Sequence, residues 1–330
     1  MAHRGFDDQM AALDALKGQP LDADSLELIK KSIASRSNFL VAKAARLAEE
    51  NELADLVPAI IAAFERYFVN AEKTDPQCWA KNALSRALSK LGCKDKDVFL
   101  RGLHHHQMEP VWGGRSDTAG TLRANCAHAL MGCDGLIAQD VLLLLLDLLT
   151  DADKQVRVEA VRAIGQLDEM AVPVLRLRAM LSVKDPEEIE VLSACFSVLL
   201  GIDRDASIPF VARSLVRGDD AAGEAAFALA ETRHPAALEA MMAARLQPAN
   251  DPWFAGVLLS AIALTRLPQA INYLIGIIES EDREAPEVIE ALLKSSPGPE
   301  LRARIEQVVE ETGSTRLRKA WQENQTQSAR

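Results

Sequence analysis

The feature that most constrains the fold is a short pattern that recurs along the chain at intervals of 31 to 43 residues. Its clearest copy runs from Asp151 to Leu167, where acidic turn residues precede apolar side chains spaced four and three residues apart. That spacing places the apolar side chains on one face of a helix. Looser copies start near Ser37, Asp75, Asp117, Asp185, Asp219, Asp251 and Asp282. A period of this length, with two helical segments per unit, is typical of an α-solenoid.

Each copy is predicted to form a helical hairpin, the first over residues 24–34 and 38–50 and the eighth over 268–279 and 284–294. Asp, Ser or Asn precedes most of the second helices, as expected of a residue that caps free backbone amides. Pro76, Pro186 and Pro252 each follow an Asp and are expected at the first helical position, where a missing N–H costs nothing. The first buried residues of the second helices are predicted to be Leu40, Trp79, Leu122, Val156, Ile189, Ala222 and Trp253.

We therefore predict an all-α, right-handed solenoid of about eight hairpins, with essentially no strand. The expected divisions are a leader over residues 1–21, a repeat array over 22–298, capping helices over 299–323 and a flexible tail over 324–330. A closing unit is expected because the last repeat must cover its open apolar face. The tail is polar enough to predict disorder.

Composition narrows the function classes. The formal net charge of −11 opposes binding along a phosphate backbone, which requires clustered Lys and Arg. The five cysteines form no Cys-x-x-Cys pair, so reduced thiols in a cytoplasmic setting are expected rather than a disulfide framework. The amino-terminal residues lack an apolar signal region, and the apolar run over residues 141–146 is too short to span a bilayer. A soluble, cytoplasmic protein is expected.

The hairpins resemble HEAT repeats, an armadillo-like architecture. The copy from Asp151 to Leu167 is similar to the short bacterial form found in phycobilisome-lyase-like HEAT families, and the resemblance covers about residues 22–295. It implies that the second helices line a concave face, and that an Asp six residues before an Arg joins neighbouring repeats in a ladder. Asp151 with Arg157 and Asp117 with Arg123 match that spacing. Other copies depart from it, with Ala80, Glu190 and Gly223 after the first predicted core residue.

One connection is longer than the others. About ten residues separate His106 from Asp117, whereas three to six residues suffice elsewhere. Long loops on a rigid repeat scaffold often carry function. Trp112 beside Gly113 and Gly114 places an aromatic ring next to bare backbone that a ligand could approach closely. Two readings stay open: a binding loop, or a loop in which Trp112 folds back to fill a gap between hairpins.

No catalytic motif is evident, so we expect no enzyme activity and no cofactor. The chain has no Gly-x-Ser-x-Gly elbow and no phosphate-binding glycine loop. Three consecutive histidines, His104 to His106, point about 100° apart on a helix and cannot all meet one metal ion, so no metal site is expected. Cys126 and Cys195 occupy core-like helical positions.

The leading prediction is a scaffold that binds a protein partner on the concave face. The predicted partner-binding residues are Trp112, Gly113, Gly114, Arg115, Arg123, Arg157 and Arg162. An alternative is a lyase or chaperone acting on a tetrapyrrole-bearing protein, as the resemblance suggests. A third possibility is a HEAT-like DNA-repair protein, which the acidic charge disfavours because its DNA-binding face would be basic.

Overall fold

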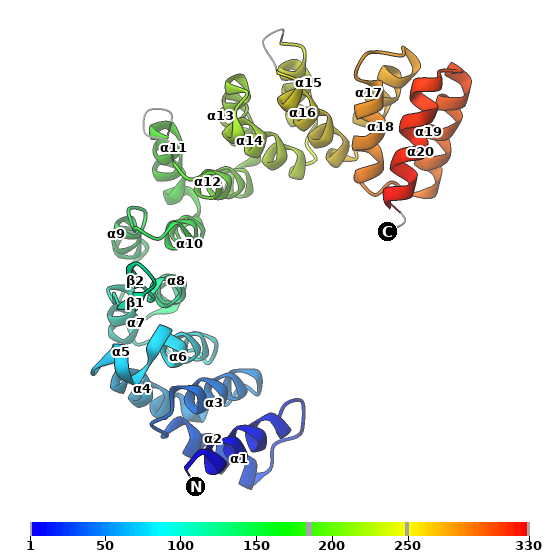
Figure 1. Cartoon of the computed structure of the whole chain (residues 1–330). Helices are drawn as coiled ribbons and strands as arrows, with labels where there is room; N and C mark the ends of the chain where they lie inside the picture. The colour runs from blue at the N-terminus through cyan, green and yellow to red at the C-terminus, as the bar shows by residue number, and fades with distance from the viewer. Residues whose placement is uncertain (1, 183–186, 248–250, 329–330) are drawn as a thin grey trace. The chain divides into compact units, whose positions relative to one another are not determined.

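Helices account for most of the computed structural model, which describes residues 2–182, 187–247 and 251–328. The prediction of an all-α chain is confirmed, except for one short pair of strands. The chain divides into two units, residues 1–171 and 172–330. Figure 1 labels the elements of each unit.

The first unit contains ten α-helices and one β-hairpin among its described residues. They are α1 (Ala2–Ala15), α2 (Ala23–Ile33), α3 (Asn38–Glu50), α4 (Val57–Arg66), α5 (Ala71–Thr74), α6 (Trp79–Lys90), α7 (Lys96–Leu103), β1 (Met108–Val111), β2 (Gly114–Asp117), α8 (Gly120–Ala129), α9 (Ala138–Leu148) and α10 (Lys154–Gly165). Short 3-10 turns cover Ala54–Leu56, Pro76–Cys78, Leu130–Gly132 and Asp168–Met170.

The second unit is helical throughout its described residues. Its elements are α11 (Ala171–Leu181), which begins at the boundary, α12 (Ile189–Ile202), α13 (Arg204–Ala212), a 3-10 turn (Arg213–Arg217), α14 (Asp220–Glu231), α15 (Pro235–Arg245), α16 (Pro252–Thr265), α17 (Pro268–Glu279), α18 (Ala285–Lys294), α19 (Pro299–Thr312) and α20 (Thr315–Ser328).

Helices that are neighbours in the repeat pattern are also neighbours in space. In the first unit α3 packs on α6, α6 on α8 and α8 on α10, while α2, α4, α7 and α9 pair with α3, α6, α8 and α10. In the second unit α12, α14, α16, α18 and α20 contact one another in that order. Within each unit the second helices of the hairpins therefore form one row, as the repeat pattern predicts (Figure 1).

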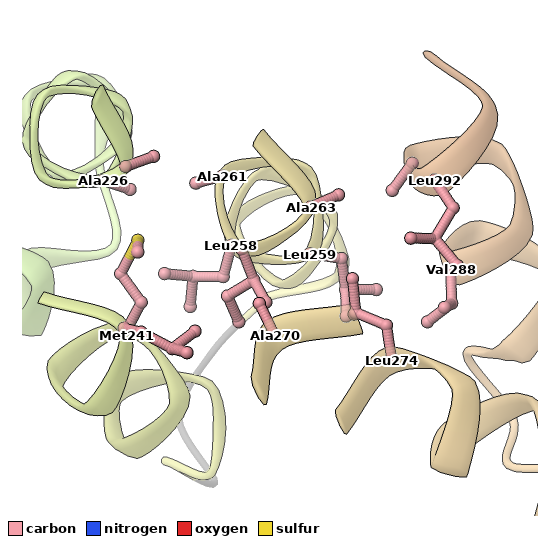
Figure 2. Close-up of a cluster of buried hydrophobic side chains, with 14 of the residues drawn as sticks. Ala226, Met241, Leu258, Leu259, Ala261, Ala263, Ala270, Leu274, Val288 and Leu292 are labelled. Carbon is pink, nitrogen blue, oxygen red and sulfur yellow. The ribbon is translucent and has the colours of Figure 1, made fainter. Parts of the chain in front are cut away.

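Small side chains let these helices approach closely. Figure 2 shows Ala226 of α14 facing Ala261 of α16, while Ala263 lies on the side of α16 toward Leu292 of α18. These residues are at most 4% exposed, and Leu258 is fully buried below them. Alanine gives up no side-chain rotamer freedom on burial, so a core rich in alanine loses little side-chain conformational entropy on folding. Helix α10 also packs through a small residue, since Ala160 is fully buried.

The expected helix caps form at several positions. Asp153, Asp219 and Asp251 accept hydrogen bonds from amides in the first turns of α10, α14 and α16. Pro252 is the first residue of α16, as predicted. Pro76 instead lies in a 3-10 turn ahead of α6, and Pro186 lies outside the described residues. Ser37 precedes α3 without capping it through its side chain.

Two of the predicted core residues are exposed. The side chain of Trp79 is 43% exposed and that of Trp253 is 50% exposed, whereas the next residues, Ala80 and Phe254, are fully buried. The prediction was one residue out of phase at both helices. In α6 the backbone explains the shift: Gln77 and Cys78 both have positive φ, which turns the chain before the helix begins at Trp79.

The chain ends are helical over most of their described length. Helix α1 occupies much of the segment expected to be a leader, and it packs on α3 with Leu13 fully buried. At the other end α19 and α20 occupy the expected capping segment, and α20 continues to Ser328, inside the segment expected to be a flexible tail. None of the helices described here combines the length and apolar character needed to cross a bilayer.

Candidate functional site

The long connection between α7 and α8, for which the sequence predicts a loop, is a short β-hairpin. Met108 pairs with Asp117 at its base and Val111 with Gly114 at its tip, which leaves Trp112 and Gly113 in the turn. Gly113 has a φ of +89°, a conformation that residues with a β-carbon rarely adopt. Gly114 does not share this constraint, because its φ is not positive and a β-carbon there would meet no atom within 4 Å.

The base of the hairpin is held by a buried carboxylate. Glu109 on β1 is 9% exposed and accepts hydrogen bonds from the Gln77 amide at 2.6 Å and the Thr118 hydroxyl at 2.9 Å. The Gln107 side chain donates to it as well, and also donates to the carbonyl of Asp75 at 2.9 Å. Burial alone favours the neutral acid, but these hydrogen bonds outweigh it and lower the pKa of Glu109. The hairpin is therefore anchored by an ionised group.

A second carboxylate joins the base of the hairpin to the segment after α7 and to the start of α8. Asp117 accepts from the amides of Gln107 and Ala119, from the His106 ring at 2.8 Å, and from Arg123 Nη1 at 2.7 Å. Burial favours its neutral form, but the two amides, His106 and Arg123 hold the pKa of Asp117 well below its usual range. The predicted pairing of Asp117 with Arg123 is present.

Arg123 continues this ladder to the next repeat. Its Nε and Nη2 atoms contact the two carboxylate oxygens of Asp151 at 2.8 and 3.0 Å, a bidentate arrangement, and Nη1 also donates to the carbonyl of His105. The side chain of Arg123 is 1% exposed. The sequence predicted Arg123 to contact a partner; in the structure its guanidinium is buried and donates to three residues of its own chain, an arrangement that stabilises the stack.

The other arginines of the predicted site lie apart from one another. Arg157 is half-buried and donates to the main-chain carbonyl of Asp151 at 2.7 Å, which gives it a structural contact. Arg162 is 56% exposed on α10 and pairs with Glu159 at 2.6 Å. Arg115 on β2 is 53% exposed and donates to Glu72 at 2.9 Å and to the carbonyl of Met108. Only Arg115 lies beside Trp112 in the hairpin.

One ladder position escaped the sequence interpretation. Asp75 forms an ion pair with Lys81 at 3.0 Å, and both side chains are fully buried. Asn38 of the preceding repeat donates to Asp75 at 3.3 Å. The spacing of six residues is the one expected for the ladder, but lysine occupies the arginine position. The sequence signal for this pair is an Asp six residues before a Lys, in place of the Arg that the ladder pattern names.

The tip of the hairpin is apolar and unprotected. The Trp112 side chain has a relative exposure of 103%, so the whole ring lies in solvent, and Met108 and Val111 are also exposed. The reading in which Trp112 folds back to fill a gap between helical hairpins is therefore wrong. A rigid base thus presents an aromatic ring that packs against nothing in the described chain.

The cysteines and the three consecutive histidines are not arranged around a common centre. All five cysteines are free and buried, and burial raises the pKa of the Cys78 thiol to about 11 and that of Cys195 to about 12. His104 contacts the carbonyl of Leu100, His105 contacts Gln107 and His106 contacts Asp117, so the three histidines point to separate partners. The described residues contain no group of three His, Cys, Asp or Glu side chains suited to one metal ion.

Comparison with known proteins leaves the site to be judged on its geometry. No protein-family model matches the chain, and no curated protein matches it significantly.

Proposed function

We propose that this protein is a non-catalytic scaffold that binds a protein partner, and that the β-hairpin at residues 108–117 carries the main contact. The proposal includes a right-handed solenoid of about eight HEAT-like hairpins in a cytoplasmic protein. The rows of second helices within each unit and the Asp117–Arg123–Asp151 ladder support the repeat architecture.

The observation that carries the proposal is the complete exposure of Trp112 on a rigidly built hairpin. Tryptophan is seldom left wholly in water, and it is enriched among the few residues that contribute most to the binding energy of protein interfaces. The hydrogen bonds to Glu109 and Asp117 order the hairpin before binding. A preorganised anchor loses less conformational entropy on association, so more of its burial energy contributes to affinity.

The residues around the tip favour a protein as the partner. Val111, which is next to the turn, is also exposed and apolar, while Arg115 and Glu72 supply one charge of each sign. An aromatic anchor with an arginine and a polar rim is the usual composition of a protein–protein contact. A phosphate backbone would require an excess of cations, and the chain carries a net charge of −11.

The test compares two single variants of the full chain. Trp112→Ala removes the exposed ring, and Val216→Ala removes a side chain that is 86% exposed in the second unit. Both variants should melt within about 2 °C of the wild type, since surface substitutions usually change stability by less than about 0.5 kcal/mol. Partners that co-purify from the native cell should be lost with Trp112→Ala and retained with Val216→Ala. Retention of the same partners by folded Trp112→Ala would refute the proposal.

A further inference from the structure

A second candidate site lies away from the β-hairpin, in a cavity of about 320 Å³ formed by α1, α3 and α6 of the first unit. Its apolar lining includes Leu13, Ala42 and Leu47, all buried. This volume is at the lower end of the range for ligand pockets, roughly 300–1,000 Å³. The cavity therefore suits a side chain with its adjoining backbone better than a large cofactor.

Two aromatic rings form part of the cavity lining and remain open to solvent. Phe39 on α3 and Trp79 on α6 are 47% and 43% exposed, with ring centroids 5.6 Å apart and planes tilted by 53°. These are the only two aromatic residues in the lining. A tilted pair at this separation is a favourable aromatic geometry that still leaves ring faces to cover.

Local backbone geometry puts Trp79 in this position. Gln77 and Cys78 both adopt positive φ, a conformation that is costly for residues other than glycine. The Gln77 amide is held by Glu109, and the Gln77 side-chain oxygen accepts the Trp79 indole N–H at 3.3 Å. These two hydrogen bonds maintain an unfavourable turn, and the turn leaves the indole of Trp79 beside the cavity.

The charged residues of the lining favour an anionic ligand. Lys43 is already paired with Asp14 and donates to the carbonyl of Met10 at 3.2 Å. Lys17 and Arg46 are exposed and form no ion pair with any described residue, which sets two uncompensated cations against the single carboxylate of Glu50. The charged residues of the lining therefore sum to one positive charge, although the whole chain carries a net charge of −11.

We infer that this cavity binds an acidic peptide segment that inserts one apolar side chain against Phe39 and Trp79 and sets its carboxylates on Arg46 and Lys17. The inference deepens the proposed function and rests on it in one respect, because the peptide belongs to a protein partner. Aromatic rings and unpaired cations could also hold single-stranded nucleic acid. A phosphate backbone requires a longer run of clustered cations than the two unpaired ones of this lining, and the chain as a whole carries a net charge of −11, so a short acidic peptide is favoured.

The test titrates the full chain against labelled probes by fluorescence polarisation. The probes are short synthetic peptides with one apolar residue (Leu, Ile, Met, Phe or Trp) between acidic residues, the same peptides with lysines in place of the acids, and oligothymidylate. At least one acidic peptide should bind saturably, and more weakly as salt is added. The lysine peptides should not bind.

Variants locate the binding. Arg46→Glu should weaken the acidic peptide by roughly tenfold, and Trp79→Ala by at least about tenfold. Lys90→Glu makes the same charge change at an exposed residue of α6 outside the cavity and should leave affinity unchanged. Circular dichroism confirms that each variant is folded. No saturable peptide binding, equal affinity for wild type and Arg46→Glu, or preferential binding of oligothymidylate would each overturn the inference.

Trp112→Ala separates this inference from the proposed function. Trp112 is in the β-hairpin and does not line the cavity, so the Trp112→Ala variant should bind the acidic peptide with wild-type affinity. If partners are lost with Trp112→Ala but Arg46→Glu binds the peptide normally, the cavity inference fails and the hairpin proposal stands. If peptide binding depends on Arg46 while partners survive Trp112→Ala, the hairpin proposal fails and the cavity inference stands.

Discussion

Replacing Arg123 with alanine should be among the most damaging single changes in the first unit. The substitution removes four hydrogen bonds, two to Asp151, one to Asp117 and one to the carbonyl of His105. It removes the arginine partner of two carboxylates that are largely buried in the wild-type structure, where the side chain of Asp151 is 5% exposed and that of Asp117 is 20% exposed. Breaking a buried ion pair from one side typically costs about 3–5 kcal/mol, because the remaining charge stays buried.

Not all of that cost need be realised, because each carboxylate keeps other donors. Asp117 retains the amides of Gln107 and Ala119, and Asp151 retains the amide of Asp153. We therefore expect about 3 kcal/mol, or a fall in melting temperature of roughly 6–12 °C for a unit of this size. Arg123→Lys keeps the charge but loses the bidentate geometry and should fall between the wild type and Arg123→Ala.

Thermal melting followed by far-ultraviolet circular dichroism, with urea titration as a second probe, measures the effect. Arg162→Ala is the matched control, because that arginine is 56% exposed and pairs only at the surface, where an ion pair contributes about 0–1 kcal/mol. The reasoning would be refuted if Arg123→Ala and Arg162→Ala melted at the same temperature.

Two further predictions follow from the same core. Ala160→Leu should cost roughly 1–3 kcal/mol or more by overpacking a fully buried position, whereas Lys154→Ala at the exposed start of α10 should change stability by less than about 0.5 kcal/mol; equal melting of the two would contradict the burial of this helix. Stability should also fall as the pH drops below about 4. The folded-state pKa of Asp117 lies below its ordinary value of 3.8, so its contribution is present above that value and is lost as pH falls. In urea titrations at several pH values, Asp117→Asn should make the free energy of unfolding depend less on pH below about 4. An unchanged pH dependence would show that Asp117 is not its cause.

The helical layout was predictable because it follows from spacing alone. Apolar residues four and three apart specify a helix face, and the repetition of that face about every 35 residues predicts which helices are neighbours. The Asp117–Arg123 pairing was predictable for a similar reason, since a residue shortly before a helix lies close to the first turn of that helix. Burial of Arg123 was not predictable, because it depends on the carbonyl of His105 and on Asp151 in other segments.

The errors arise where tertiary contacts decide the backbone. The β-hairpin has strands of only four residues, and Pro110 within β1 weakens any strand signal, although a Gly at the turn was visible. The prediction that Trp79 is buried was wrong because the turn at Gln77 and Cys78 changes the phase of the helix. That turn depends on Glu109, more than thirty residues later in the chain, and so is not evident from the local sequence. The cavity could not be anticipated, since one of its walls is α1, which was interpreted as a leader.

The measurement that tests partner binding by the hairpin most directly is site-specific photo-crosslinking. Benzoylphenylalanine is placed at position 112 in one sample and at position 216 in another, since both native side chains are highly exposed. After irradiation in the native cell, the account predicts a defined crosslinked adduct from position 112, with the same partner that wild-type protein co-purifies, and none from position 216. Absence of an adduct from position 112, or the same adducts from both positions, would contradict it.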